Sequence, residues 1–241
     1  MDTFSRTRFL LGPDAMEKLK NAHVAIFGLG GVGGYVAEAL VRSGVGKLDF
    51  IDHDTISPTN INRQILATAA TIGMDKAEAA ADRAKAINPA IQAKAIKTFY
   101  LPETADQFDF TQYDYVVDAI DTVTGKMMLV KAAKDAGTPI ISSMGTGNNL
   151  DPTAFRVADI HETSVCPLAR IIRKECRKRG IDKLKVVYST EDPIKLELPP
   201  DDPAWAELPE GRNALPGSVC FVPAAAGMII AGEVIKDLIS K

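Results

Sequence analysis

The chain has 241 residues, of which 46% are hydrophobic and 24% are charged, and its formal net charge is −3 at pH 7. This balance is ordinary for a globular protein with a substantial core, and it excludes a disordered chain and a protein that is basic overall. The sequence holds neither an apolar run long enough to span a membrane nor a signal-peptide core. We therefore expect a cytoplasmic protein with no membrane insertion.

The first 22 residues are expected to form a short arm and then a helix from about Pro13 to Lys20, because proline is favoured in the first turn of a helix. Arg6 and Arg8 lie on the arm. A guanidinium group suits phosphate but is also common on protein surfaces, so both roles stay open for these arginines.

The stretch from His23 to Gly44 has the pattern of a strand, a glycine turn and a helix. Its opening apolar run is typical of a parallel strand covered on both faces. The next predicted strand ends on Asp52, where nucleotide-binding domains of this kind place an acid on the ribose hydroxyls. Glycines in the turn let a phosphate approach the N–H groups of the following helix. The candidate nucleotide-binding glycines are Gly28, Gly30, Gly31 and Gly33.

A purely structural role for this stretch stays open. The glycines could serve only close packing of helix on strand, and Asp52 could cap the following turn. The spacing also leaves the nucleotide undecided, since the oxidoreductase pattern GxGxxG lacks the extra central glycine of GLGGVGG.

A compact polar cluster follows the second strand and suggests contacts to phosphate. A helix is then expected from Asp75 to Ile87, with Lys76 in its first turn. Because the helix dipole favours acids at that end, a lysine there is better interpreted as a phosphate ligand than as a surface residue. The cluster consists of Asn60, Asn62, Arg63 and Gln64.

Two acids stand at the carboxyl end of the next apolar strand, predicted from Tyr115 to Ile120. Open α/β sheets bind their ligands at this end of their strands. Asp121 is therefore a candidate to hold Mg²⁺ against nucleotide phosphates. The alternative is that Asp121 caps a helix beginning near Val123.

The pattern changes after residue 150. Residues 153–160 alternate as an antiparallel or edge strand does, and residues 164–181 predict a helix that carries the only strongly basic stretch. That helix is either a solvated face or a patch for an RNA backbone. Its candidate RNA-binding residues are Arg170, Arg173, Lys174, Arg177 and Lys178.

The remaining segments are a long loop over residues 193–217 and a small-residue final helix from 221 to 239, which is expected to be packed or dimer-forming. We predict an α/β fold with a Rossmann-like, doubly wound, mostly parallel sheet, extended by antiparallel strands in the C-terminal third. One domain is expected over residues 1–241. Its parts are an N-terminal arm and helix (1–22), a nucleotide-binding core (23–150) and a substrate-binding and dimer-forming extension (151–241).

The motifs GLGGVG, IDHD, NINRQ, GMDKAEA and DAIDT resemble those of the adenylating enzymes related to ubiquitin activation, the ThiF/MoeB/HesA family. Their order and spacing agree throughout residues 6–145. The resemblance implies that ATP is bound, that Asp52 contacts the ribose and that Asp121 supports Mg²⁺. It also implies that Arg8 reaches into the site of a neighbouring subunit, and hence a homodimer. The triphosphate would be held by Asn60, Arg63 and Lys76, with Asp54 and Gln64 also at the nucleotide.

The C-terminal third decides the branch of that family. It lacks the CxxC pairs that bind zinc in activators of carrier proteins. The segments NLDPTAFRVADI, CPLARIIRKECRKRGI and VVYSTE resemble the branch that dehydrates threonylcarbamoyladenosine in tRNA. This resemblance implies a tRNA partner, a carboxyl-adenylate intermediate, and release of AMP and pyrophosphate. No enzyme nucleophile is needed, and Cys220 is interpreted as a packing cysteine. A sulfur-relay protein partner stays open.

Three further functions compete. The chain could adenylate the C-terminus of a ubiquitin-like sulfur-carrier protein, although the missing CxxC pairs argue against it. It could be an NAD-dependent oxidoreductase, in which NINRQ and Lys76 would have no role. It could also be a nucleotide sensor that binds ATP without catalysis.

Overall fold

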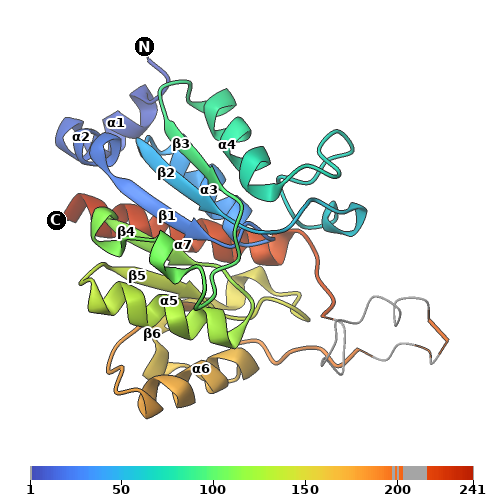
Figure 1. The fold of residues 1–241 in the computed structure, drawn as a ribbon. Coiled ribbons are helices and arrows are strands. Elements are labelled where there is room, and N and C mark those ends of the chain that lie inside the picture. The colour runs from blue at the N-terminus through green and yellow to red at the C-terminus, as the bar shows by residue number, and fades with distance from the viewer. Residues whose placement is uncertain (1, 197–198, 200, 203–215, 241) are drawn as a thin grey trace.

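The computed structural model describes residues 2–196, 199, 201–202 and 216–240. These residues form a sheet with helices on both faces (Figure 1), and its strand order is β3-β2-β1-β4-β5-β7-β6. Neighbouring strands pair in parallel except β6, which runs antiparallel to β7 at one edge. The strands are β1 (His23–Phe27), β2 (Lys47–Ile51), β3 (Gln92–Ile96), β4 (Tyr115–Asp118), β5 (Ile140–Ser143), β6 (Phe155–Asp159) and β7 (Lys185–Ser189).

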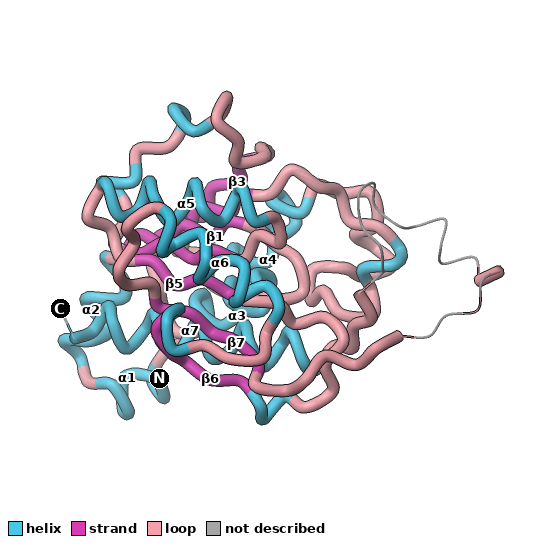
Figure 2. Tube along the Cα trace, turned by 90° about the horizontal axis from the view of Figure 1, so that it is seen from below, coloured by secondary structure: helices cyan, strands magenta, loops and turns pink. Residues whose placement is uncertain are grey.

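The helices divide between the two faces of this sheet, as Figure 2 shows from below. One apolar core lies under α3, α4 and α7, and a second lies under α5 and α6. This is the predicted doubly wound fold with an antiparallel pair on the C-terminal side, and the prediction is confirmed. The helices are α1 (Ser5–Leu11), α2 (Pro13–Asn21), α3 (Gly33–Arg42), α4 (Lys76–Ile87), α5 (Val123–Asp135), α6 (Pro167–Lys178) and α7 (Phe221–Ser240).

The N-terminal arm is the element that the sequence prediction gets wrong, because it is helical. Helix α1 packs against α2 across Gly12, which has a φ of +87°. The Asp2 side chain accepts the N–H of Phe4 and the hydroxyl of Ser5, which fixes the chain just before the helix. The expected second helix, by contrast, is confirmed as α2.

The final helix is packed, as expected. Gly227 sits so close to α3 that a Cβ there would lie 2.6 Å from the Val32 carbonyl oxygen. No helix among the described residues combines the length and hydropathy that crossing a bilayer would require. The predicted loop over 193–217 lies largely outside the described residues, and its described flanks contain neither helix nor strand.

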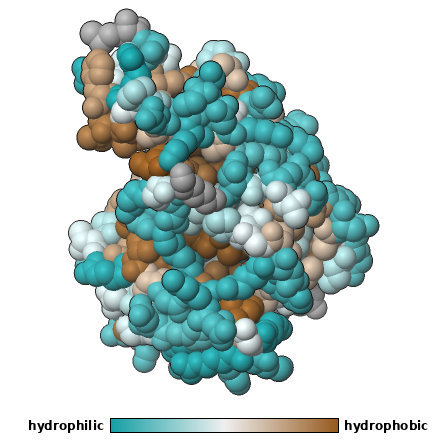
Figure 3. Space-filling view, turned by 90° about the vertical axis from the view of Figure 1, so that its left-hand side faces the viewer, coloured by the Kyte–Doolittle hydropathy of each residue, from teal (hydrophilic) through white to brown (hydrophobic). Residues whose placement is uncertain are grey.

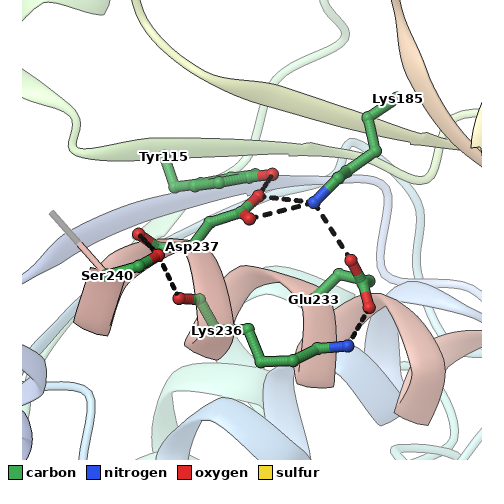
Figure 4. A network of polar contacts seen from close by, with 6 residues as sticks. All are labelled: Tyr115, Lys185, Glu233, Lys236, Asp237 and Ser240. Atoms are coloured by element: carbon green, nitrogen blue, oxygen red, sulfur yellow. Dashed lines mark hydrogen bonds and ion pairs between the residues drawn. The ribbon is translucent and has the colours of Figure 1, made fainter.

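A network of polar contacts joins the C-terminal half of α7 to the sheet (Figure 4). The buried Tyr115 hydroxyl on β4 donates to Asp237 at 2.6 Å, and the ammonium group of Lys185 on β7 contacts Asp237 and Glu233 at 2.8 Å and 3.0 Å. Burial raises the pKa of Asp237, but the hydrogen bonds from Lys185 and Tyr115 outweigh that effect, so its pKa is lowered. The ionised carboxylate therefore stabilises the folded state.

Replacing Asp237 with alanine should lower the free energy of unfolding by about 1–3 kcal/mol, because it leaves the buried Tyr115 hydroxyl without its acceptor. The lowered pKa makes this contribution present above about pH 4 and lost as the pH falls further. Urea denaturation across pH 3–7 should therefore show a flatter acid limb for the variant.

The exposed pair Lys131–Asp135 on α5 offers the control. Lys131→Ala should cost less than about 0.5 kcal/mol, as exposed i,i+4 pairs do. An Asp237→Ala variant as stable as Lys131→Ala would show that the network does not hold α7.

Candidate functional site

A pocket of about 730 Å³ opens at the carboxyl ends of the parallel strands. Its walls come from the glycine turn after β1, the end of β2, the NINRQ segment, the start of α4, and the loops after β4 and β5. The first turn of α6 closes one side through Pro167 and Leu168. The predicted residues that line it are Gly28, Gly30, Gly31, Asp52, Asp54, Asn60, Arg63, Gln64, Lys76 and Asp121.

The glycines of the turn divide into two kinds. A Cβ on Gly28 would lie 2.6 Å from the Ala119 carbonyl oxygen, and one on Gly33 would lie 1.8 Å from the Gly28 carbonyl oxygen. These two glycines permit close packing, and Gly33 does not line the pocket. Gly30 has open space where its Cβ would be, so it leaves room for a ligand.

Asp52 is buried and holds the turn in shape. Its two carboxylate oxygens accept the N–H of Leu29 at 2.6 Å and that of Asp54 at 2.9 Å. Because each carboxylate oxygen has a second lone pair, Asp52 can still accept a hydroxyl from a ligand. The sequence therefore places this acid correctly at the pocket but gives no sign of its contact with the glycine turn.

The cationic side of the pocket is preorganised. Lys76 is 6% exposed, and its ammonium group lies 2.7 Å from Asp54. The guanidinium of Arg63 donates to the Thr59 carbonyl at 2.8 Å and to Asn62 at 2.9 Å. These contacts fix two positive charges at the pocket wall without cancelling both, which suits a polyanionic ligand.

The two amide side chains nearby differ in their availability. The side-chain oxygen of Asn60 accepts the N–H of Ser57 and so supports its own turn. Gln64 is buried, and its Oε1 has no partner among the described residues. A buried acceptor without a partner is costly, so Gln64 is the better candidate for a direct ligand contact.

Two acidic groups could serve a cation. Ligand atoms of Asp52, His53 and Asp54 lie within 4.8 Å of one another, but Asp54 is already paired with Lys76. Asp121 is exposed and lines the pocket from the loop after β4, outside that cluster. A carboxylate beside a phosphate site is the hard oxygen ligand that Mg²⁺ takes, so Asp121 fits such an ion.

A buried ion pair beneath this wall is a feature that the sequence does not predict. Asp118 and Lys126 are both fully buried, and their charged groups lie 3.0 Å apart. Lys126 also donates to the Ser143 carbonyl at 2.6 Å, and Asp118 accepts the N–H of Ile120. The pair thus joins the loops that leave β4 and β5, and Asp121 is on the first of them.

Helix α6 leads away from the pocket with its cations outward. Arg173 is the exception, because it donates to the carbonyl and hydroxyl of Thr163 at 2.6 Å and 2.7 Å. The other four cations predicted to bind RNA form no ion pair within the described part of the chain. These exposed cations are Arg170, Lys174, Arg177 and Lys178.

Two further predictions concern Arg8 and Cys220. Arg8 is exposed on α1 and does not line the pocket. Cys220 is exposed rather than packed, so that interpretation is wrong: it precedes α7, and its thiol lies 2.9 Å from the Tyr35 hydroxyl. Burial, followed by this hydrogen bond, raises the pKa of Tyr35 to about 12.

The fold and the pocket define a nucleotide-binding α/β protein whose phosphate side carries fixed cations. A family model described as the ThiF family matches residues 4–241, and the chain belongs to this family. The tRNA threonylcarbamoyladenosine dehydratase of Bacillus subtilis is 41% identical and covers 98% of this chain and 94% of its own length. That of Escherichia coli is 34% identical, with coverage of 99% and 94%.

A solved structure agrees with these relatives. The E. coli dehydratase TcdA in complex with ATP superposes with a TM-score of 0.87 at 31% identity, over 98% of this chain and 93% of that one. The predicted resemblance to this branch is therefore confirmed. The comparisons support the expected class, an ATP-using adenylating enzyme.

Replacing Lys126 with methionine should lower the free energy of unfolding by about 3–5 kcal/mol, because it leaves the buried Asp118 carboxylate uncompensated. Urea denaturation measures this loss. The double variant Asp118→Asn with Lys126→Met should recover part of it, since no buried charge then remains. Equal losses in the single and double variants would show that the loss does not come from an uncompensated charge on Asp118.

Proposed function

We propose that this protein dehydrates threonylcarbamoyladenosine in tRNA, using ATP to activate the substrate carboxylate. One observation carries the proposal: a single pocket combines the predicted phosphate-binding residues with the first turn of the basic helix α6. Relatives named for this reaction align over nearly the whole chain and support the same conclusion. A tRNA substrate also favours the expected cytoplasmic location.

The nucleotide would lie with its ribose at Asp52 and its phosphates between the glycine turn and the cations. Gly30 leaves space there, and the N–H groups that open α3 favour an anion. Arg63 and Lys76 would neutralise the triphosphate, and Gln64 would supply its free acceptor to a donor group. Mg²⁺ held by Asp121 would supply further neutralisation of phosphate charge when bound.

The proposed chemistry has two steps. In the first, an oxygen of the substrate carboxylate attacks the α-phosphorus of ATP, a new O–P bond forms, and pyrophosphate leaves with the electron pair of the broken bond. In the second, the ureido group of the same nucleoside attacks the activated carbonyl, loses a proton and expels AMP as the ring closes. The net change in the nucleoside is the loss of one water. Arg63 and Lys76 act by stabilising phosphate charge, which requires their correct position but no covalent bond between enzyme and substrate.

The exposed cations of α6 are the proposed contact to the tRNA backbone. The helix begins at the pocket wall and is 12 residues long, so its cations extend about 18 Å from the reacting nucleoside. Successive phosphates along the backbone of a tRNA stem can contact this row of α6 cations. The overall charge of −3 makes this local patch more important, since the rest of the surface offers no general attraction to RNA.

A homodimer is part of the proposal. Arg8 lies outside the pocket of its own chain, and the neighbouring α1 residues Phe9 and Leu10 are 71% and 85% exposed. Figure 3 shows hydrophobic patches on the side of the molecule that carries α1. A second copy covering this side would bury apolar surface and give Arg8 a neighbouring site.

The test is ATP–pyrophosphate exchange with tRNA that carries threonylcarbamoyladenosine, followed by mass analysis of the nucleosides. We expect exchange that depends on this tRNA, together with a nucleoside lighter by one water. Arg63→Ala and Lys76→Ala should each lower exchange by about 100-fold or more, because each removes a preorganised charge from the phosphates. Lys131→Ala, at an exposed position of α5 that does not line the pocket, is the control and should show ATP–pyrophosphate exchange at the wild-type rate.

The outcomes separate the competing functions. Exchange that needs a small carrier protein instead of tRNA would replace the proposal with activation of a carrier C-terminus. ATP binding without any exchange would leave a nucleotide sensor. Specific binding of NAD in place of ATP would point to an oxidoreductase.

A separate test addresses α6. Replacing Lys174, Arg177 and Lys178 together with alanine should weaken tRNA binding. The slope of the logarithm of the binding constant against the logarithm of salt concentration should fall by an amount equal to about three phosphate contacts. ATP affinity should not change. The control removes the same charge from distant surfaces, by alanine at Lys20, Lys85 and Lys94. If both triple variants weaken tRNA binding equally, α6 is not the contact.

A further inference from the structure

Asn148, in the loop after β5, has an unusual backbone. Its φ is +62°, and among the described residues only Val165 shares a positive φ without being glycine. Asparagine tolerates this left-handed conformation better than most residues, but it is still uncommon. Such a conformation persists where surrounding contacts fix it.

Those contacts tie two distant chain segments to Asn148. The backbone N–H of Asn148 donates to the Gly217 carbonyl at 2.8 Å, and its side-chain Oδ1 accepts the Gly217 N–H at 2.6 Å. Its own carbonyl accepts the N–H of Ile194 at 2.7 Å. One residue therefore holds both Pro193–Leu196 and Pro216–Ser218.

The second of these segments is also held from the phosphate side. The Asn62 amide donates to the Ser218 carbonyl at 3.0 Å, and the same side chain accepts a hydrogen bond from Arg63. Pro216 and Ser218 line the pocket, as do Pro193 and Asn148 itself. The wall formed by residues 216–218 is thus fixed between a phosphate-binding arginine and the loop after β5.

We propose that Asn148 is a positioning residue that sets this wall for the acceptor substrate rather than for ATP. Its hydrogen bonds reach the wall but none of the glycine turn, Asp52, Lys76 or Asp121. The inference rests on the proposed function, because it assigns the wall to the activated nucleoside. A separate contact, from Asn62, links the same wall to Arg63 and does not involve Asn148.

The test uses three variants of Asn148 in the full-length protein. Asn148→Gly keeps the left-handed backbone accessible and removes only the side-chain acceptor, whereas Asn148→Ala also strains the backbone. Asn148→Asp restores an oxygen acceptor for the Gly217 N–H. Asn88→Gly, the same substitution at the end of α4, is the control.

For Asn148→Gly we expect about a fivefold rise in KM for tRNA, on the scale of one lost hydrogen bond, with ATP affinity unchanged and a urea midpoint close to that of the control Asn88→Gly, which also loses one hydrogen bond. Asn148→Asp should return KM close to the wild-type value. A parallel change in ATP affinity, or no change in KM, would overturn the inference.

A second measurement separates this inference from the proposed function. Amide hydrogen exchange should speed up in peptides covering 193–196 and 216–219 of Asn148→Gly, and not in Asn88→Gly. If wild-type protein does not modify tRNA, the proposed function fails and with it the assignment to an acceptor nucleoside. Unchanged amide hydrogen exchange in those peptides of Asn148→Gly would refute the positioning role itself, whatever the substrate.

Discussion

The site depends on the buried ion pair between Asp118 and Lys126. Ligands of open α/β folds bind where strands end, and the chain there has left the regular hydrogen bonding of the sheet. The Lys126 ammonium group contacts both the Asp118 carboxylate and the Ser143 carbonyl, so this buried side chain joins the ends of the adjacent strands β4 and β5. The loop that carries Asp121 is therefore positioned by a buried contact rather than by a ligand. Burying both charges is costly, and the cost is offset only while the pair is intact.

A second constraint is the space left by missing side chains. Gly28 and Gly33 let the turn after β1 pack against the loop at Ala119, and the open position at Gly30 faces the pocket. Asp52 then holds the turn through the N–H of Leu29. The acid and the glycines are one unit, in which the same carboxylate shapes the glycine turn and lines the pocket.

Much of this arrangement can be predicted from the sequence. The parallel strands are predictable because apolar runs without alternation indicate burial on both faces. Gly28, Asp52 and Asp121 are predictable pocket residues because they come directly or shortly after such strands. Helix α1 is not predicted because Phe9 and Leu10 are exposed, so its apolar residues do not follow one buried helical face. The role of Lys126 is not predicted because a lysine within a helix is usually solvated, and only the fold brings its side chain to Asp118.

The basic helix α6 also shows what the sequence alone does not predict. The sequence alone groups five cations of α6, yet Arg173 turns back to Thr163 while the remaining four stay exposed. Because the carbonyl and the hydroxyl of Thr163 are both neutral, they do not offset the positive charge of Arg173. Arg173 can therefore fix the turn before α6 and still contribute to the positive potential beside the pocket. A fixed charge in the middle of α6, a helix whose first turn lines the pocket, attracts a polyanion toward that pocket.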